Sequence, residues 1–427
     1  MQKNVSRAGL CLAIALCALT ASAEKTTVSA VVAFNPGQAA YQRILDTVEA
    51  FEKAYPDIDI DMEPIGHEIY HTKLQTLAVS GQLPDILYLW PGKRTAYITE
   101  KGLALDLRPY MERDEADKEF LPLIVASQGP NGEVYQLGNN INPTSIVYAN
   151  DDLLKEMGLS YPRTMKEWAA QAKTIRDNGY FPLIMGNKAN WVMQSCMLSA
   201  LVGRLGGDDW AKAARTGEGS FTDPEFVNAL KQIQALVDSG LLDKAVNSLD
   251  RVKAIELFMA ERAVYFIEGA WSTTDLIAGL EDDQKAYFSL NPLPAVEGER
   301  THGSSSGVAG TGFAINAKLA GTPKADAAWE WIRFYAGRQS ADIAFKHGEI
   351  PAVHDLDVPS KLDPMTVKLS NMLQDMVVTE VLDDRLDPEG INLLNGKLQE
   401  LIFGTIDAET VAAEYEAWVA EHDSNRK

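Results

Sequence analysis

Short apolar runs alternate with amphipathic helical segments along this chain, and that alternation limits its fold more than any other feature. Residues 28–34 form a β-branched apolar run, residues 41–55 carry apolar side chains at helical spacing, and residues 58–62 alternate apolar with acidic side chains. A strand, a helix and a second strand joined by tight turns form a βαβ unit, which implies a parallel sheet. The sequence therefore predicts an α/β fold.

The same alternation continues to the end of the chain. Thr164 and Glu167 have the spacing of a capping box, and Asp223-Pro224 is a typical helix start. No repeat, heptad run or low-complexity linker breaks the pattern. Further helices are predicted near 70–80, 164–178, 224–240, 324–336 and 408–421, and further strands near 85–89, 263–267 and 308–315.

The first 23 residues have the pattern of a secretory signal peptide. Lys3 and Arg7 precede a short apolar run at 8–19, and Ala21-Ser22-Ala23 offers small residues at a cleavage site. We therefore expect cleavage after Ala23 and delivery to the periplasm. The apolar run is too short to span a bilayer. A membrane anchor is the alternative, because Cys17 could carry a lipid.

Charge and cysteine content exclude several classes of protein. The formal net charge is -21, which repels a phosphate backbone, so nucleic acid is not an expected partner. After removal of the signal segment only Cys196 remains, so no internal disulfide is expected and the fold depends on its core. The sequence has no glycine-rich phosphate loop and no cysteine set for a metal, so we expect no cofactor and no metal.

Five segments in a fixed order carry a resemblance to a known family. Together they resemble the extracellular solute-binding proteins of ABC sugar importers, of the maltose-binding-protein type, over most of the mature chain. The segments are Phe51-Glu52-Lys53 with Pro56; Lys73 to Ala78 with Ser80-Gly81 and Pro84-Asp85-Ile86; Val147 to Asn150 with Leu153-Leu154, Pro162 and Trp168; Ala254 to Trp271; and Gly310 to Asn316.

The resemblance implies a two-lobed periplasmic binding protein fold of the type II kind, with a ligand cleft between lobes that are joined by crossing strands. We expect an N-terminal lobe at 24–140 plus 303–350 and a C-terminal lobe at 141–302 plus 351–427. The implied function is capture of a mono- or oligosaccharide and delivery to the transmembrane subunits of an ABC permease. The protein is expected to be a monomer and not an enzyme.

Three tryptophans are candidate ligand contacts, because sugar C–H faces stack on aromatic rings. Trp90, Trp191 and Trp271 each lie where a predicted strand gives way to a loop. The resemblance favours Trp271 most, then Trp191 and Trp90. Core or rim packing is the alternative for each of them, as it is expected for the helical tryptophans Trp168, Trp329 and Trp331.

Polar side chains are candidates for hydrogen bonds to the hydroxyl groups of a sugar. Asn35 ends the first predicted strand, although a turn asparagine also has a purely structural role. Asn140 and Asn142 precede the crossing to the second lobe, where maltose-binding relatives carry an acid; this departure puts a maltose-like ligand in doubt. Less secure contact positions, for which surface salt bridges are the alternative, are Glu68, Arg94, Glu268 and Thr311.

Two enzyme motifs also occur in the sequence. Residues 67–71, His67-Glu68-Ile69-Tyr70-His71, fit the H-E-x-x-H pattern of zinc peptidases. Pro64 and Gly66 lie just upstream, so the helix is expected to begin at the motif, and no third ligand follows. Residues 303–307 fit G-x-S-x-G, but a strand rather than a helix is predicted to follow, so a serine-rich crossover loop is the preferred interpretation.

Other functions remain open at this point. A glycosidase would need two carboxylates at a defined separation, and no such pair is evident. A receptor for a polyamine or a phosphodiester would use the same two-lobed fold. The sequence names neither the sugar nor the permease.

Overall fold

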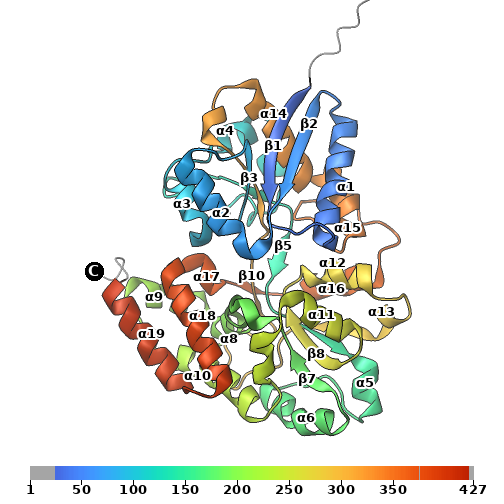
Figure 1. Cartoon of the computed structure of the whole chain (residues 1–427), viewed down its shortest axis with the longest axis vertical. Coiled ribbons are helices and arrows are strands. Elements are labelled where there is room, and N and C mark those ends of the chain that lie inside the picture. The colour runs from blue at the N-terminus through green and yellow to red at the C-terminus, as the bar shows by residue number, and fades with distance from the viewer. Residues whose placement is uncertain (1–24, 375, 423–427) are drawn as a thin grey trace, which may run out of the picture.

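The protein is described by a computed structural model of residues 25–374 and 376–422. The predicted signal peptide, with its cleavage position and both early cysteines, lies outside these residues. Within them the chain forms two lobes stacked along the long axis, with strands passing between them (Figure 1). This arrangement confirms the predicted α/β, two-lobed fold.

The first lobe is built on a sheet with the strand order β2-β1-β3-β11-β4. Strand β1 pairs in parallel with β2 and β3, and β11 runs antiparallel to β3 and β4. Its strands are β1 (Thr26–Val32), β2 (Ile58–Pro64), β3 (Ile86–Leu89), β4 (Leu137–Gly138) and β11 (Gly312–Ile315). Its helices are α1 (Ala39–Ala54), α2 (His67–Ser80), α3 (Ala96–Thr99), α4 (Arg108–Arg113), α14 (Pro323–Ala336) and α15 (Ala341–Lys346).

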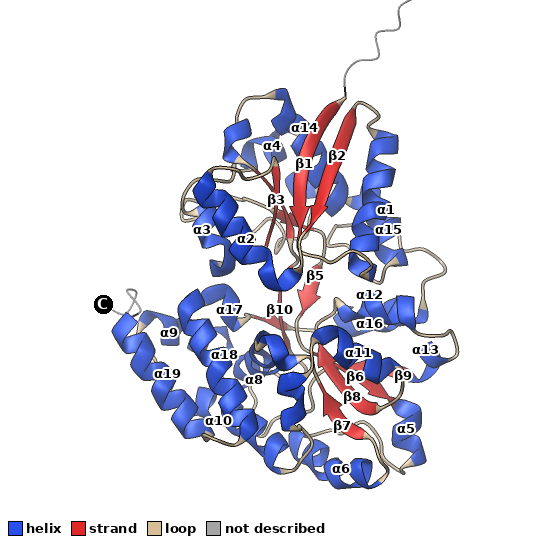
Figure 2. Ribbon diagram, in the orientation of Figure 1, coloured by secondary structure: helices blue, strands red, loops and turns tan. Residues whose placement is uncertain are grey.

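The second lobe contains a sheet with the order β7-β8-β6-β9, in which β7 and β8 are parallel. Helices flank this sheet (Figure 2). Its strands are β6 (Ile146–Asn150), β7 (Phe181–Ile184), β8 (Ala263–Glu268) and β9 (Phe288–Asn291). The helices on this side are α5 (Asp151–Glu156), α6 (Met165–Asp177), α7 (Trp191–Met193), α8 (Ser199–Leu205), α9 (Gly207–Thr216), α10 (Pro224–Asp238), α11 (Arg251–Met259), α12 (Ser272–Gly279), α13 (Gln284–Tyr287), α16 (Pro364–Gln374), α17 (Leu382–Arg385), α18 (Pro388–Phe403) and α19 (Ala408–His422).

Short strands and single helical turns complete the chain. The third sheet, between the lobes, has the order β12-β10-β5 and contains β5 (Ile141–Pro143), β10 (Ser305–Ala309) and β12 (Val378–Thr379). The short 3-10 helices are η1 (Lys93–Thr95), η2 (Ala116–Lys118), η3 (Asn187–Ala189), η5 (Lys244–Ser248), η6 (Ala317–Leu319) and η7 (Arg338–Ser340), and η4 (Gln194–Leu198) is a π-helical turn.

The large sheet of each lobe packs against an apolar core. The first-lobe core joins the inward faces of β1 and β3 to α14, whose Trp329 and Trp331 are fully buried as expected. In the second lobe the core joins β6 and β8 to α6, α8, α10, α18 and α19, and includes the buried Trp168. The C-terminal helices thus pack on the second lobe. The lobe boundaries near residues 140, 303 and 350 stay a prediction.

Two local predictions need correction. The predicted single strand at 308–315 is two strands, because the chain changes sheets at Gly310-Thr311, and Ser305 and Ser306 of the predicted loop belong to β10. In the capping box, Thr164 Oγ1 accepts from the Glu167 backbone N–H at 3.1 Å, as predicted. The Glu167 carboxylate instead accepts from the backbone N–H of Arg163, outside the helix.

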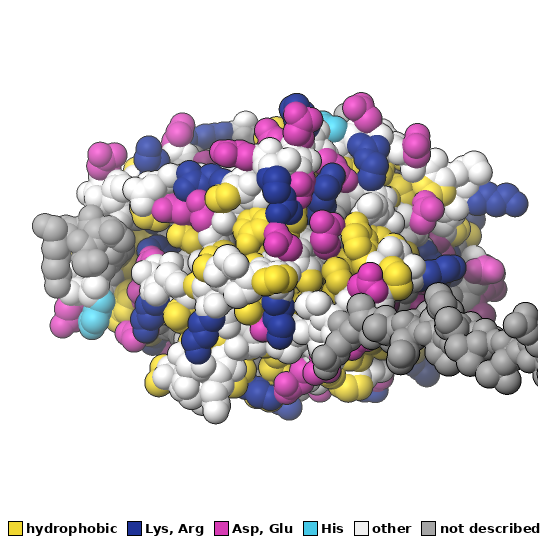
Figure 3. All heavy atoms as spheres, turned by 90° about the horizontal axis from the view of Figure 1, so that it is seen from above, with side chains coloured by type: hydrophobic (Ala, Val, Ile, Leu, Met, Phe, Trp, Pro, Cys, Tyr) yellow, Lys and Arg dark blue, Asp and Glu magenta, His cyan; other side chains and the backbone are white. Residues whose placement is uncertain are grey.

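The surface of the first lobe carries charges of both signs. On the face seen in Figure 3, Lys and Arg side chains lie among Asp and Glu side chains. In the described part of the chain no helix is both long and apolar enough to cross a membrane.

The switch between sheets depends on close backbone packing, which gives a first prediction. A Cβ on Gly312 would lie 1.9 Å from the carbonyl oxygen of Leu137 in the neighbouring strand. Gly312→Ala should therefore destabilise the fold by about 2 kcal/mol or more, because strand backbone must move. Thermal unfolding followed by circular dichroism measures the effect.

Gly396 provides the matched control, because a Cβ there meets no atom within 4 Å and the residue lies inside α18. Gly396→Ala should leave stability unchanged or raise it by about 0.5–1 kcal/mol, since alanine favours a helix. Equal unfolding midpoints for the two variants would contradict this account of the crossing strands.

Candidate functional site

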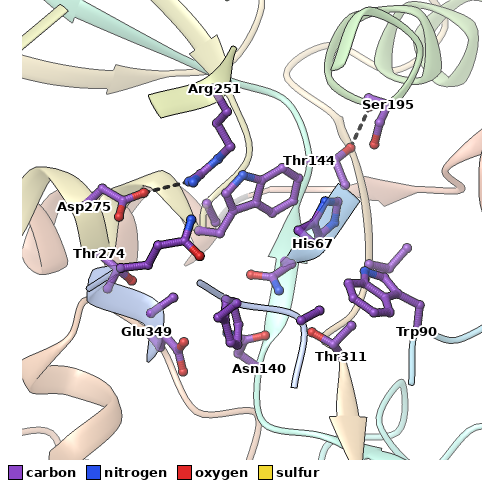
Figure 4. A pocket seen from close by; sticks show the side chains of 18 of the residues that line it. His67, Trp90, Asn140, Thr144, Ser195, Arg251, Thr274, Asp275, Thr311 and Glu349 are labelled. Carbon is purple, nitrogen blue, oxygen red and sulfur yellow. Dashed lines mark hydrogen bonds and ion pairs between the residues drawn. The ribbon is translucent and has the colours of Figure 1, made fainter. Parts of the chain in front are cut away.

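A cavity of about 520 Å³ lies between the two lobes, a size typical of small-molecule sites. Figure 4 shows side chains of both lobes facing the same open space, among them His67 and Trp90 from the first lobe and Arg251 and Asp275 from the second. Nine of the ten candidate ligand contacts named from the sequence line it. These are Asn35, Glu68, Trp90, Arg94, Asn140, Asn142, Trp191, Trp271 and Thr311.

Strand topology explains why residues distant in the sequence meet here. Asn35 and Trp90 follow the carboxyl ends of β1 and β3, which are parallel neighbours. Trp271 follows the end of β8, and Trp191 follows its parallel neighbour β7 after a short 3-10 turn. The carboxyl ends of parallel strands meet at one edge of a sheet, and ligands of open α/β sheets bind at that edge. Here the two edges face each other across the cavity.

Aromatic rings form a continuous arc from one lobe to the other. The ring centroids of Trp191 and Trp271 lie 6.0 Å apart in the second lobe. His67, at the start of α2 in the first lobe, lies 5.7 Å from Trp191 and 5.7 Å from Trp90. Each of the three tryptophans is partly exposed, whereas the core tryptophans are fully buried. The arc therefore offers apolar surface to the cavity from both sides.

Polar groups line the same cavity beside these rings. Asn140 is buried, with an exposed fraction of only 6%, and its side-chain oxygen has no hydrogen-bond partner among the described residues. Thr311 shares a hydrogen bond of 2.8 Å with the Tyr88 hydroxyl. Asn142 lies in β5, paired with Val308 of β10. These groups present amide and hydroxyl functions at the base of the crossing strands.

Glu268, the tenth candidate, is not a wall residue. Its side chain is fully buried behind Trp271, as is every residue of β8. Its Oε1 accepts a hydrogen bond of 3.2 Å from Trp271 Nε1. Burial raises the pKa of this carboxyl, and Arg251 acts in the opposite direction. The expected contact at this position is therefore indirect.

Arg94 pairs with the opposite lobe. Its Nη1 lies 3.4 Å from Asp383 Oδ2 in α17 of the second lobe, and its guanidinium lies over the Trp90 ring at 5.5 Å. Burial raises the pKa of both Asp383 and Asp384, although Arg94 lowers that of Asp383. On the other side of the cavity α1 contacts α12, so the lobes touch on both sides.

Sequence reasoning missed several charged residues that line the cavity. Arg251, at the start of α11, pairs with Asp275 of α12 at 2.7 Å. Glu349 pairs with the buried Arg43 of α1 at 3.0 Å and also contacts Asn139. Arg43 is an arginine at a buried position of an otherwise apolar helix face, and that signal could have pointed to a buried carboxylate partner.

The H-E-x-x-H segment occupies the first turn of α2, which begins at His67 after Gly66. His67 Nδ1 lies 3.4 Å from Glu68, and this contact lowers the pKa of the Glu68 carboxyl. Burial lowers the pKa of His71 to about 3, and both of its ring nitrogens lack a hydrogen-bond partner. Among the described residues no group of three or more His, Cys, Asp or Glu side chains is arranged to hold a metal ion.

Solved structures with the same fold cover nearly the whole chain. A structure from work on xylan utilization by Caldanaerobius polysaccharolyticus has a TM-score of 0.83, is 21% identical, and is matched over 92% of this chain and 100% of its own. A chitin oligosaccharide binding protein gives 0.82 at 18% identity, over 94% and 100%. Maltose-bound MalE3 of T. maritima gives 0.76 at 18% identity, over 93% and 99%. These identities support the fold alone.

Curated relatives are matched over part of their length. An uncharacterized ABC transporter extracellular-binding protein of Pyrococcus horikoshii is 25% identical over 227 residues, 52% of this chain and 51% of the relative. The multiple sugar-binding protein of Streptococcus mutans is 22% identical over 277 residues, 64% of this chain and 63% of the relative. The matched part thus spans between about half and just under two thirds of these relatives.

Residues 35–342 match the family of bacterial extracellular solute-binding proteins. This range begins at the first candidate contact, Asn35, and includes all three cavity tryptophans and both asparagines of the crossing segment. The resemblance noted in the sequence is thereby confirmed. This chain is a member of the bacterial extracellular solute-binding protein family.

Proposed function

We propose that this protein is the substrate-binding component of an ABC importer, and that it captures a neutral mono- or oligosaccharide between its lobes. The observation that carries the proposal is the arc of aromatic rings contributed by both lobes to a cavity of about 520 Å³. Aromatic rings bind the C–H faces of sugars, and the amides and hydroxyls that line the same cavity would pair with sugar hydroxyls.

The charges around the cavity favour a neutral ligand over an anionic one. Arg43, Arg94 and Arg251 are each paired with a carboxylate of the protein itself. An anionic sugar or a phosphodiester would therefore compete with these pairs rather than meet a waiting cation. The carboxylate of Glu68 on the wall, whose pKa His67 lowers, would repel it further. A polyamine would not be repelled, and it remains the second ligand class to examine.

Names of related proteins agree with this ligand class. A relative in Streptococcus mutans is a multiple sugar-binding protein, and structural neighbours include a chitin oligosaccharide binding protein and a maltose-bound protein. The family is extracellular, so the chain works outside the cytoplasm. We place it in the periplasm as a monomer after cleavage at Ala23. Its docking partner would be the transmembrane subunits of a permease, and binding would leave the ligand unchanged.

Closure of the lobes provides the mechanism. A ligand that contacts both lobes stabilises the closed state by its difference in affinity for the two states. Trp90 and Thr311 would hold it from the first lobe, and Trp191 and Trp271 from the second. Closure removes the ligand from water, which strengthens its hydrogen bonds to buried groups such as Asn140.

The ligand class is tested by thermal shift and calorimetry against neutral mono- and oligosaccharides, uronic acids, phosphodiesters and polyamines. We expect a neutral saccharide to raise the unfolding temperature and the anionic compounds to have no effect. Trp271→Ala should weaken saccharide binding about ten-fold or more, because it removes the ring platform. Trp418→Ala is the control, since Trp418 stacks on His422 in α19 and does not line the cavity. Binding of a polyamine alone would reject the sugar assignment.

The pair between Arg94 and Asp383 should contribute to closure. Asp383→Asn removes one charge of this inter-lobe pair, so we expect affinity for the saccharide to fall about two- to ten-fold, mostly through faster dissociation. Stopped-flow fluorescence measures the rates. Glu380→Gln is the matched control, because Glu380 pairs with Arg215 at 2.6 Å within the second lobe. If both variants dissociate at the wild-type rate, the pair does not hold the lobes together.

A further inference from the structure

One buried carboxylate connects two side chains that line the cavity. Glu268 is fully buried at the end of β8. Its Oε1 accepts from Trp271 Nε1 at 3.2 Å, and its Oε2 lies 3.6 Å from Arg251 Nε. Both partners lie on the cavity wall, whereas Glu268 does not. The carboxylate is therefore placed behind the wall with one oxygen toward each partner.

The indole of Trp271 is held by more than this hydrogen bond. A Cβ on Gly269 would lie 2.3 Å from two atoms of the six-membered ring, so the ring lies directly against the glycine backbone. The ring is also near Trp191, at a centroid distance of 6.0 Å and an angle of 51° between the ring planes. Because Gly269 has no side chain, the indole can pack against its backbone, and Glu268 fixes the direction of the indole N–H. Together these contacts select one orientation of the ring.

The guanidinium of Arg251 is oriented in a similar way. Its Nη2 donates to Asp275 at 2.7 Å and to the Ser272 hydroxyl at 3.2 Å, while its Nε faces Glu268. Two carboxylates on different elements thus fix the plane of one guanidinium. Figure 4 shows the Arg251 side chain directed toward Asp275 at the edge of the open space. A fixed guanidinium offers its remaining N–H groups in a defined direction.

The energetics of burial indicate that the carboxylate at position 268 is not needed for packing. A buried ion pair costs desolvation free energy, and apolar residues of similar volume often replace such pairs without loss of stability. The thiol of Cys196, 3.6 Å from Oε1, contributes only a weak contact. The orientation of the two wall residues is what an apolar residue would fail to supply.

We propose that Glu268 is a positioning residue, which sets the orientation of Trp271 and Arg251 for ligand without contacting the ligand itself. The inference rests on the proposed function, because it takes Trp271 to be the platform on which a sugar ring stacks. Preorganised side chains bind more tightly because less freedom is lost on binding.

Two near-isosteric variants test the proposal. Glu268→Gln keeps an oxygen that can accept from the indole but removes the charge facing Arg251, and we expect affinity to fall about three-fold or more. Glu268→Met removes both the hydrogen-bond acceptor and the charge. We expect the affinity to fall ten-fold or more, because the Trp271 indole is no longer held in one orientation. The indole N–H resonance of Trp271, assigned with Trp271→Phe in tryptophan-labelled protein, should move and exchange faster in Glu268→Met but not in Glu268→Gln.

Glu299→Gln is the matched control. Glu299 is a largely buried carboxylate of the same lobe, paired with the fully buried Arg204 at 3.3 Å, and it does not line the cavity. Its variant should lose stability without loss of affinity. In a Trp271→Phe background, Glu268→Met should cost less affinity than in wild type, because the indole N–H is already gone. Additive losses would overturn the link between Glu268 and Trp271.

The two proposals fail in distinguishable ways. If wild type binds no saccharide, the proposed function is rejected, yet the indole resonance still decides whether Glu268 fixes Trp271. If saccharide binds but folded Glu268→Met matches wild type in affinity and in the indole resonance, the positioning role is rejected. If Glu268→Met does not fold, Glu268→Gln against Glu299→Gln decides: a loss confined to position 268 supports the proposal, and equal affinities overturn it.

Discussion

The close backbone contact where the chain returns from one lobe to the other is the constraint on which the rest of the structure depends. Gly312 of β11 lies against the carbonyl of Leu137, and Gly310 lies against Asn140 just beyond β4. These contacts fix β5 and β10 side by side in the connection between the lobes. Because the connection is narrow, the two sheets can be brought together with their strand ends facing one another, and the cavity forms at that junction.

The pairing of charged side chains around the cavity follows from its position between the lobes. Arginines and carboxylates at an interface between lobes lose water on both sides, so each charge needs a partner from the protein. The pairs of Arg43 with Glu349 and of Arg251 with Asp275 supply these partners within single lobes, whereas the pair of Arg94 with Asp383 crosses between lobes. The wall is therefore polar but internally compensated. Such a wall can pair with hydroxyl groups while leaving little free charge for an ion.

Much of the fold could be predicted from the sequence because its signals are local. The βαβ start follows from periodicity at 28–62, and the α14 helix follows from its apolar spacing. The break between β10 and β11 could not be predicted, since it depends on two glycines meeting backbone from elsewhere in the chain. The ion pair of Arg43 with Glu349 joins residues whose numbers differ by 306. A single sequence does not indicate which residues so far apart in the chain are in contact.

The candidate site was predicted better in its position than in the roles of its residues. The carboxyl ends of parallel strands lie at one edge of a sheet, where ligands bind. Trp90, Trp191 and Trp271 follow such ends, so the sequence alone could place them near a cavity. Whether a side chain at such an end faces outward or inward depends on the next turn. At Glu268 the strand is still fully buried, and the chain first becomes partly exposed at Trp271, after the buried Ala270. The sequence therefore locates the cavity, but it does not separate Trp271, which lines the cavity, from Glu268, which lies buried three positions earlier.

Under the proposed function, the ion pair of Arg94 with Asp383 between the lobes would also limit how tightly the protein holds its ligand. The apparent affinity for a ligand falls when fewer molecules are in the binding-competent state. Contacts that favour the closed, ligand-bound state therefore raise the affinity. Contacts that are too strong would close the empty protein and exclude the ligand. Asp383 is buried, and burial penalises its charged form, so the net attraction within the pair is small. Under the proposed function, a weak pair of this kind would favour closure once ligand bridges the lobes and would still allow the ligand to be released.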